Sequence, residues 1–398
     1  MAKRTPKTIL YRIARDIYSF YLRCASKIDK RMILFSSYVD YSDNARALSD
    51  YLVDNGYLEK YDIYWAVKNV ERCKNLYPNA RVKFVSSSGW GSVTIQKYAY
   101  KSVWQFGTHG VVKFFKDHDE NRHFVNLWHG SSYKDNENRS AYEHEFDNVK
   151  FDVALVAGPL FVKTKAKFWN CSESKILPLG YPRYDWLLKK DDKSYLYLVS
   201  FKKSKDSRVI VWMPTFRNDK NGAFMETDSM TQFPLINSSK EWHELDQWCI
   251  EKDVVIIVKL HPYQKEYDIC WNELNNITNI TNEEIENAHI TLYSMLSYVD
   301  GLISDYSSVG VDFMVVNKPI AFTLDDFEYY SSLRGFIVDD PRVYMPGHHL
   351  YTFQDLKIYV SDVASGSDVY SEKRKELYGK LIHKSNGYCK DLVEYLKL

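Results

Sequence analysis

The sequence predicts an α/β protein built from two Rossmann-like halves with parallel sheets. The first observation is length, because 398 residues exceed one ordinary core and suit two domains. The second is the alternation of short apolar runs with helical segments, which indicates parallel strands covered by helices. The third is that this series starts twice, on either side of a charged stretch at residues 189–193. We therefore expect an N-terminal domain over residues 31–195 and a C-terminal domain over residues 196–398.

Each predicted strand is a short apolar run bounded by polar or small residues. In the first half these runs lie at residues 31–37, 61–67, 81–85, 102–106, 124–128 and 151–157. In the second half they lie at residues 209–213, 254–260, 289–293, 301–304 and 318–323. A helix is predicted over residues 45–55, and one or two more from residue 356 onward.

The composition narrows the class of protein. Lys and Arg number 53 against 52 Asp and Glu, so overall charge does not indicate nucleic acid, and we expect no such partner. A mean hydropathy of -0.42 argues against an integral membrane protein. The six cysteines form no C-x-x-C pair, and scattered thiols suit a reducing cytoplasm. No signal peptide and no run long enough to span a membrane is evident.

The first 31 residues are strongly basic. Only Asp16 and Asp29 oppose the basic side chains, which are Lys3, Arg4, Lys7, Arg12, Arg15, Arg23, Lys27, Lys30 and Arg31. Apolar residues recur at helical spacing at Ile9, Ile13, Ile17, Phe20, Cys24 and Ile28. Such a basic amphipathic helix can lie in a membrane interface, or it can dock on its own domain. We expect residues 1–30 to bind an anionic membrane surface.

Residues 301–313 combine a buried strand, a polar turn and a helix that begins near Ser307. A helix start gathers unpaired backbone N–H groups and the positive end of the helix dipole, which favours anions. Ser307 and Ser308 add hydroxyl donors for phosphate oxygens. The alternative is an ordinary N-cap with a spare serine.

Ligands of open parallel sheets bind outside the carboxyl ends of the strands. In the first half, His129 follows a predicted strand directly. In the second half, the residues in equivalent positions are Thr215, Arg217, His261, Ser307 and Ser308. If the halves face each other, two histidines and a phosphate-binding helix start converge on one cleft. Either histidine alone can instead be an ordinary loop residue.

Seven short motifs occur in a fixed order over residues 31–350. They are Trp128-His129-Gly130, Gly180-Tyr181-Pro182-Arg183, Pro214-Thr215-Phe216-Arg217, Lys259-Leu260-His261-Pro262, Ser304-Asp305-Tyr306-Ser307-Ser308, Lys318-Pro319-Ile320 and Leu333-Arg334-Gly335-Phe336. This series resembles the motifs of the CDP-glycerol glycerophosphotransferase family, the teichoic acid primases and polymerases. The opening Tyr41-Ser42-Asp43-Asn44 is also similar.

The resemblance implies a GT-B-like fold, with two facing domains of which the second holds the nucleotide. It implies transfer of glycerol phosphate from CDP-glycerol to a hydroxyl of a lipid-linked wall or capsule polymer precursor. CMP would be released, and the enzyme would lie on the inner face of the cell membrane. His129 matches the general base, and His261 matches a histidine at the donor phosphates. The further residues assigned to substrate binding are Thr215, Arg217, Asp305, Ser307, Ser308 and Arg183.

Two loops depart from the family pattern. Where the family commonly reads Trp-His-Gly-Thr-Pro-Leu-Lys, this chain has Ser131-Ser132-Tyr133 in place of Thr-Pro-Leu. His348-His349 replaces the last proline of a familiar Pro-Gly-Pro. The acceptor and the donor polyol therefore stay open, with CDP-ribitol or another polyol donor, and a capsule polymerase, as alternatives. A nucleotide-sugar glycosyltransferase and a non-catalytic, membrane-docked binding protein are more distant ones.

No cofactor is expected, since CDP-glycerol is a substrate, and a divalent metal is not clearly required. Four polar pairs or triplets have the residue types of a metal site, but none shows a complete ligand set. They are Asp117-His118-Asp119, Asp325-Asp326, Asp339-Asp340 and His348-His349. A base and a phosphate clamp on opposite domains require closure, so a hinge is expected near residue 195.

Overall fold

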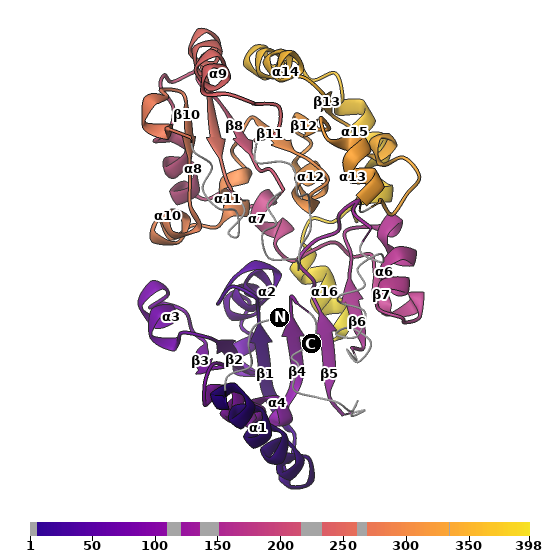
Figure 1. The fold of residues 1–398 in the computed structure, drawn as a ribbon. Coiled ribbons are helices and arrows are strands. Elements are labelled where there is room, and N and C mark those ends of the chain that lie inside the picture. The colour runs from indigo at the N-terminus through magenta and orange to yellow at the C-terminus, as the bar shows by residue number, and fades with distance from the viewer. Residues whose placement is uncertain (1–5, 110–120, 136–150, 216–232, 261–268, 334) are drawn as a thin grey trace.

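Two parallel sheets, each covered by helices, lie one above the other in a computed structural model of the chain (Figure 1). The structure describes residues 6–109, 121–135, 151–215, 233–260, 269–333 and 335–398. This arrangement confirms the predicted α/β class with two Rossmann-like units.

The first sheet is parallel at every pairing. Its strands are β1 (Asp29–Ser36), β2 (Asp62–Val67), β3 (Lys83–Ser86), β4 (Ser102–Gly107), β5 (His123–Asn126), β6 (Val153–Leu155) and β7 (Ile176–Leu177). They lie in the order β3-β2-β1-β4-β5-β6-β7. Leu34 of β1 stands opposite Tyr64 of β2 and Gln105 of β4. The direction of winding reverses between β1 and β4, where such sheets bind ligands.

The second sheet repeats this plan. Its strands are β8 (Arg208–Trp212), β9 (Val254–Val258), β10 (Ile277–Asn279), β11 (Gly301–Ser304), β12 (Ile320–Thr323) and β13 (His348–Leu350). They lie in the order β10-β9-β8-β11-β12-β13, again all parallel. The switch point here falls between β8 and β11.

Helices cover both faces of each sheet. Before β8 they are α1 (Pro6–Ala25), α2 (Asp43–Asp54), α3 (Val70–Leu76), α4 (Gly91–Lys101), α6 (Val162–Phe168), α7 (Tyr184–Leu188) and α8 (Asp192–Val199). After β8 they are α9 (Ser239–Lys252), α10 (Asn282–Asn287), α11 (Leu292–Leu296), α12 (Ser308–Phe313), α13 (Phe327–Leu333), α14 (Phe353–Ser365), α15 (Ser371–Leu381) and α16 (Tyr388–Leu396). The predicted helix at 45–55 corresponds to α2.

The hydrophobic core is continuous between the halves. One cluster of buried side chains includes Phe35 and Trp65 of the first half and Tyr306 and Phe313 of the second. A separate cluster fills the other face of the second sheet around Trp212. The halves therefore share a packed seam.

The prediction of a strand at residues 289–293 is wrong. Thr291 instead caps α11, because its Oγ1 accepts a hydrogen bond of 3.0 Å from the backbone N–H of Ser294. The backbone N–H of Thr291 donates to the Ser294 hydroxyl in return, at 3.1 Å. A run this short fits a helix turn or a strand equally well, and the capping box decides for the helix. The short strands β7, β10 and β13 were not predicted either.

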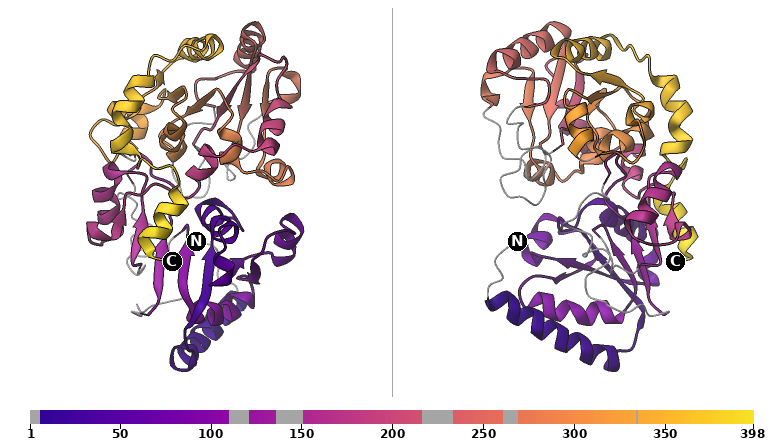
Figure 2. Two further views of the ribbon diagram at one scale, coloured as in Figure 1. Left: turned by 180° about the vertical axis from the view of Figure 1, so that it is seen from behind. Right: turned by 45° about the vertical axis from the view of Figure 1, so that its right-hand side comes forward.

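The last helix, α16, returns to the first half (Figure 2). The backbone N–H groups of Tyr388 and Cys389 donate to the Asp185 carboxylate at 2.7 and 3.0 Å. Leu392 and Val393 are buried in the cluster that both halves share. The division at residue 195 stays a prediction, and the sequence pattern did not foresee this return.

The helix α1 lies along α4 (Figure 2). Ser19 donates to Gln96 at 2.9 Å, the rings of Tyr11 and Trp90 meet edge to face at 5.0 Å, and Leu22 is buried. The apolar residues on the outer side are exposed, namely Leu10, Ile13, Ile17, Phe20, Tyr21 and Cys24. The predicted apolar stripe therefore faces away from the domain. Within the described residues, no helix is both long and apolar enough to cross a bilayer.

Candidate active site

The turn that carries His129 is held by two asparagines. It follows β5, and Trp128 there adopts a left-handed φ of 52°, which is unfavourable for a bulky side chain. Asn126 accepts a hydrogen bond of 3.0 Å from the backbone N–H of Trp128. Asn44, at the start of α2, donates to the carbonyl of Trp128 at 2.8 Å. These bonds compensate the strain and fix the direction in which His129 leaves the strand.

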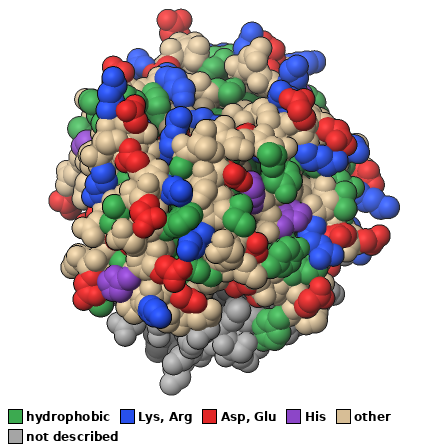
Figure 3. Space-filling model, turned by 90° about the horizontal axis from the view of Figure 1, so that it is seen from above, with side chains coloured by type: hydrophobic (Ala, Val, Ile, Leu, Met, Phe, Trp, Pro, Cys, Tyr) green, Lys and Arg blue, Asp and Glu red, His purple; other side chains and the backbone are tan. Residues whose placement is uncertain are grey.

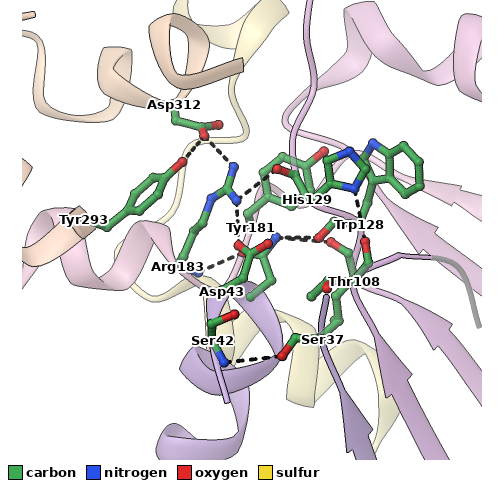
Figure 4. A network of polar contacts seen from close by, with 12 residues as sticks. Ser37, Ser42, Asp43, Thr108, Trp128, His129, Tyr181, Arg183, Tyr293 and Asp312 are labelled. Atoms are coloured by element: carbon green, nitrogen blue, oxygen red, sulfur yellow. Dashed lines mark hydrogen bonds and ion pairs between the residues drawn. The ribbon is translucent and has the colours of Figure 1, made fainter. Parts of the chain in front are cut away.

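The imidazole of His129 is oriented by the end of β4 (Figure 4). Its Nδ1 lies 3.2 Å from the carbonyl oxygen of Thr108. A carbonyl only accepts, so Nδ1 carries the hydrogen and Nε2 has the lone pair. Burial lowers the pKa of His129 well below its ordinary value, and neighbouring His109, Lys165 and Arg183 lower it further. The ring is therefore a neutral imidazole whose Nε2 carries no proton.

The next residue, Gly130, touches the start of α12 in the other half. A Cβ atom on Gly130 would lie 2.3 Å from Oγ of Ser308, so no side chain fits there. Ser307 is the N-cap residue of α12, with extended backbone, which confirms the predicted helix start. The His129 turn and the Ser307/Ser308 turn thus face each other directly.

The loops after β8 and β11 are joined through Asp305. Its carboxylate accepts hydrogen bonds from the backbone N–H groups of Thr215, at 2.6 Å, and Ser307, at 3.0 Å. The Thr215 hydroxyl donates to the same carboxylate. Lys134 of the first half reaches across and places its Nζ 3.1 Å from Oγ1 of Thr215. Predicted site residues at the switch point of the second sheet are thus brought together.

The loop at residues 131–133, whose sequence differs from the family pattern, forms part of the seam between the halves. The backbone N–H of Ile337 donates to the carbonyl of Tyr133 at 2.9 Å, and the buried Tyr133 hydroxyl donates to the carbonyl of Tyr344 at 2.5 Å. Ser131 is also buried, with its hydroxyl 2.8 Å from that of Tyr181. These two side chains are therefore committed to packing.

Arg183 joins the two halves beside His129 (Figure 4). Its guanidinium donates to Asp43 of the first half at 2.6 Å and to Asp312 of the second at 2.5 Å. It also donates to the carbonyl of His129 at 3.0 Å. Tyr293 donates to Asp312 at 2.5 Å, and Tyr184 donates to its other oxygen. Burial raises the pKa of the Asp312 carboxyl, while these three donors oppose the rise.

Several predicted residues fall outside the described part of the chain. His261, Arg217 and the Asp117-His118-Asp119 triplet are among them. Lys259, just before His261, is buried at the end of β9, and burial lowers its pKa to about 8. The structure describes the remaining predicted site residues, which are His129, Arg183, Thr215, Asp305, Ser307 and Ser308.

The remaining metal candidates have protein partners. Asp325 accepts from the backbone N–H of Leu235 at 3.0 Å, Asp340 pairs with Arg342 at 2.9 Å, and His348 lies 3.3 Å from Asp362. Within the described residues, no three His, Cys, Asp or Glu side chains gather in a way that can hold a metal ion.

Residues 17–393 match the family model of CDP-glycerol:poly(glycerophosphate) glycerophosphotransferases. The chain belongs to this family. The glycerophosphotransferase chain is 25% identical to the teichoic acid glycerol-phosphate transferase of Staphylococcus aureus, over 99% of its own length and 98% of that protein. It is 29% identical to the teichoic acid ribitol-phosphate primase of Bacillus spizizenii, over 47% of its own length and 44% of that protein. It thus spans less than half of one of these relatives and nearly all of the other.

Solved structures support the fold of this glycerophosphotransferase. The wall teichoic acid polymerase TagF superposes with a TM-score of 0.75 at 20% identity, covering 98% of this chain and 94% of the other. The two facing parallel sheets and this likeness confirm the expected GT-B-like architecture.

Three residues at the site of this glycerophosphotransferase were not singled out from sequence. His109 follows β4 as His129 follows β5, so the strand-end rule that selected His129 also selects His109. Asp43 lies in the Tyr41-Ser42-Asp43-Asn44 motif, which resembles the family but by itself assigns no role to this carboxylate. Asp312 appears in the sequence as one polar residue in an apolar helix, which gives no hint of its partners.

Proposed function

We propose that this chain transfers glycerol phosphate from CDP-glycerol to a hydroxyl of a lipid-linked wall or capsule polymer precursor, with release of CMP. Family membership supports the reaction class. The observation that carries the proposal is the contact between the His129 turn of one half and the Ser307/Ser308 turn of the other. A donor pyrophosphate held at the second turn would present its phosphorus near the imidazole of His129.

In this mechanism the acceptor hydroxyl attacks the phosphorus that carries glycerol, and the bond to the CMP oxygen breaks. His129 Nε2 takes the hydroxyl proton, and its lowered pKa keeps it available as a base. His261, Arg217 and the Ser307/Ser308 turn stabilise charge on the pyrophosphate and on the leaving CMP. Phosphoryl transfer depends chiefly on positioning and charge stabilisation, which the contact between the His129 turn and the Ser307/Ser308 turn favours.

The donor is tested by incubating purified protein with CDP-glycerol or CDP-ribitol and a synthetic lipid-linked disaccharide. We expect CMP release with CDP-glycerol and a product heavier by one or more glycerol-phosphate units. Ribitol-phosphate addition would instead follow the Bacillus spizizenii relative, whose name is that of a ribitol-phosphate primase. No CMP from either donor would contradict the proposal. The product masses also distinguish a primase from a polymerase.

We also propose that α1 docks the enzyme on an anionic membrane from the inner side. Ile17 and Phe20 on its outer face are 67% and 70% exposed, and residues 1–31 carry nine basic side chains against two acidic ones. Apolar side chains flanked by cations suit the boundary between lipid headgroups and acyl chains. By contrast, Lys and Arg are interspersed with Asp and Glu on the face formed by the second half (Figure 3). The lipid-linked acceptor would be reached from this surface.

Replacing two apolar residues on the exposed face of α1 should release the protein from vesicles. In the Ile17→Asp/Phe20→Asp variant, we expect partition onto phosphatidylcholine vesicles containing phosphatidylglycerol to fall at least about tenfold, because two apolar side chains are lost from the interface. Sedimentation measures the bound fraction. Leu196→Asp, an equally exposed position on α8, is the control and should bind like wild type. Undiminished binding of the double variant would contradict the assignment to α1.

A further inference from the structure

A second histidine lies against His129. The rings of His109 and His129 are stacked, with centroids 4.3 Å apart and planes 13° from parallel. His109 directly follows Thr108, whose carbonyl fixes the tautomer of His129, and its Nδ1 lies 3.1 Å from the Thr108 hydroxyl. Two consecutive residues therefore hold the imidazole of His129, one at its edge and one over its face.

The described groups around the two rings differ in charge. Burial lowers the pKa of His109 below its ordinary value, the nearby Asp43 carboxylate favours a proton on its ring, and Lys68 opposes one. The ring of Tyr38 covers His109 at 4.9 Å. His109 is exposed to solvent, whereas His129 is only partly exposed. Asp43 and solvent therefore make His109 the easier of the two rings to protonate.

His129 faces a cationic environment. Lys165 and Arg183 both disfavour a proton on it, in addition to His109, and the ring of Trp128 lies 4.0 Å away. Two stacked imidazoles at this distance repel each other strongly when both are charged, so the pair binds its two protons in separate steps. The first proton then belongs mainly to His109.

We propose that His109 is a positioning residue for the transfer reaction, which takes up the first proton on acidification and thereby keeps the stacked His129 unprotonated and able to act as the base. This rests on the proposed role of His129. In each turnover the acceptor hydroxyl gives its proton to Nε2 of His129, the new P–O bond forms, and CMP leaves with the electron pair of the broken bond. His109 exchanges no proton with substrate. Its effect is on the pH range over which His129 can accept one.

The test replaces the titrating ring by a flat ring of similar size. In His109→Phe the stacking surface is kept, but the ring at position 109 can no longer be protonated. Because no positive charge then forms beside His129, we expect His129 to titrate at higher pH than in wild type. The titration is followed on the full-length protein by ¹⁵N-imidazole NMR, with the His129 signal identified by its absence in His129→Gln. His109→Gln keeps a hydrogen-bonding group without titrating and should shift His129 in the same direction. It also tests the proposal if the phenylalanine variant does not fold.

Activity provides a second measurement. Relative to wild type, kcat/KM of His109→Phe should fall about threefold more at about pH 5.5 than at about pH 8.5, because burial, Lys165 and Arg183 still disfavour a proton on His129. His243→Phe, at an exposed position on α9, is the control and should leave the profile unchanged. An unchanged His129 titration in both His109 variants overturns the inference, whether or not the enzyme uses CDP-glycerol. A shifted titration together with full activity of His129→Ala would instead overturn the base assignment alone.

Discussion

Replacing His129 by alanine is expected to lower kcat for glycerol-phosphate transfer by about 10²- to 10⁴-fold, the usual contribution of a general base. The Thr108 carbonyl already holds Nδ1, so only Nε2 can accept the hydroxyl proton, and alanine leaves no substitute at that point. Because the donor is proposed to sit on the other half, KM for CDP-glycerol should change much less than kcat. Steady-state CMP release against donor concentration measures both.

The control for this substitution is His243→Ala, an exposed histidine on α9, which should turn over like wild type. His261→Ala should also abolish most transfer, but with a larger effect on the use of donor, because His261 is proposed to contact its phosphates. Both variants must keep the wild-type circular dichroism spectrum. A fully active His129→Ala enzyme would exclude His129 as the base.

Replacing Asp312 by alanine should destabilise the protein by about 3–5 kcal/mol, the usual cost of leaving one partner of a buried ion pair alone. Asp312 is fully buried and Arg183 is 4% exposed. Without this carboxylate, Arg183 keeps Asp43 as its one ionic partner among the described residues, and the hydroxyls of Tyr184 and Tyr293 lose their acceptor. Chemical denaturation followed by tryptophan fluorescence measures the loss.

Two further variants decide whether pairing is the cause. Glu376→Ala removes an exposed ion pair with Lys373 on α15 and should cost less than about 1 kcal/mol. In a double-mutant cycle, Arg183→Met added to Asp312→Ala should cost much less than the two single effects combined, since no lone buried charge is left. Strict additivity would mean that the two side chains stabilise the seam independently.

The sequence was informative wherever a pattern is local. β9 is apolar at every position and buried throughout, so its type could be read from five residues. The helix start at Ser307 was equally clear, because a serine N-cap precedes an apolar run. The segment at 289–293 was predicted wrongly, because its composition is typical of a strand. The capping box between Thr291 and Ser294 makes it the start of a helix instead. β7 has only two residues, too few for any periodicity to appear.

The site also contains residues that a local pattern predicts and residues that it does not. The position of His129 after a strand was predictable, and that of His109 would have been with the same rule. The contacts of Arg183 were not, because Asp43 and Asp312 lie 140 and 129 residues away in the chain. No spacing rule links residues so distant, and only the packing of the two sheets brings them together. Arg183 was predicted to bind substrate, a role that stays a prediction beside its observed place in the seam.

The return of α16 to the first half also bears on how the chain folds during synthesis. Domains generally fold in order as the ribosome releases them, each completing its core before the next is made. Here Leu392 and Val393 contribute to the core beside the first sheet, although they are translated after the whole of the second sheet. Part of the apolar surface of the first half therefore stays exposed until α16 has been synthesised. Burial of α16 becomes a late step that closes both halves together, and a chain halted before it would expose that surface to chaperones and proteases.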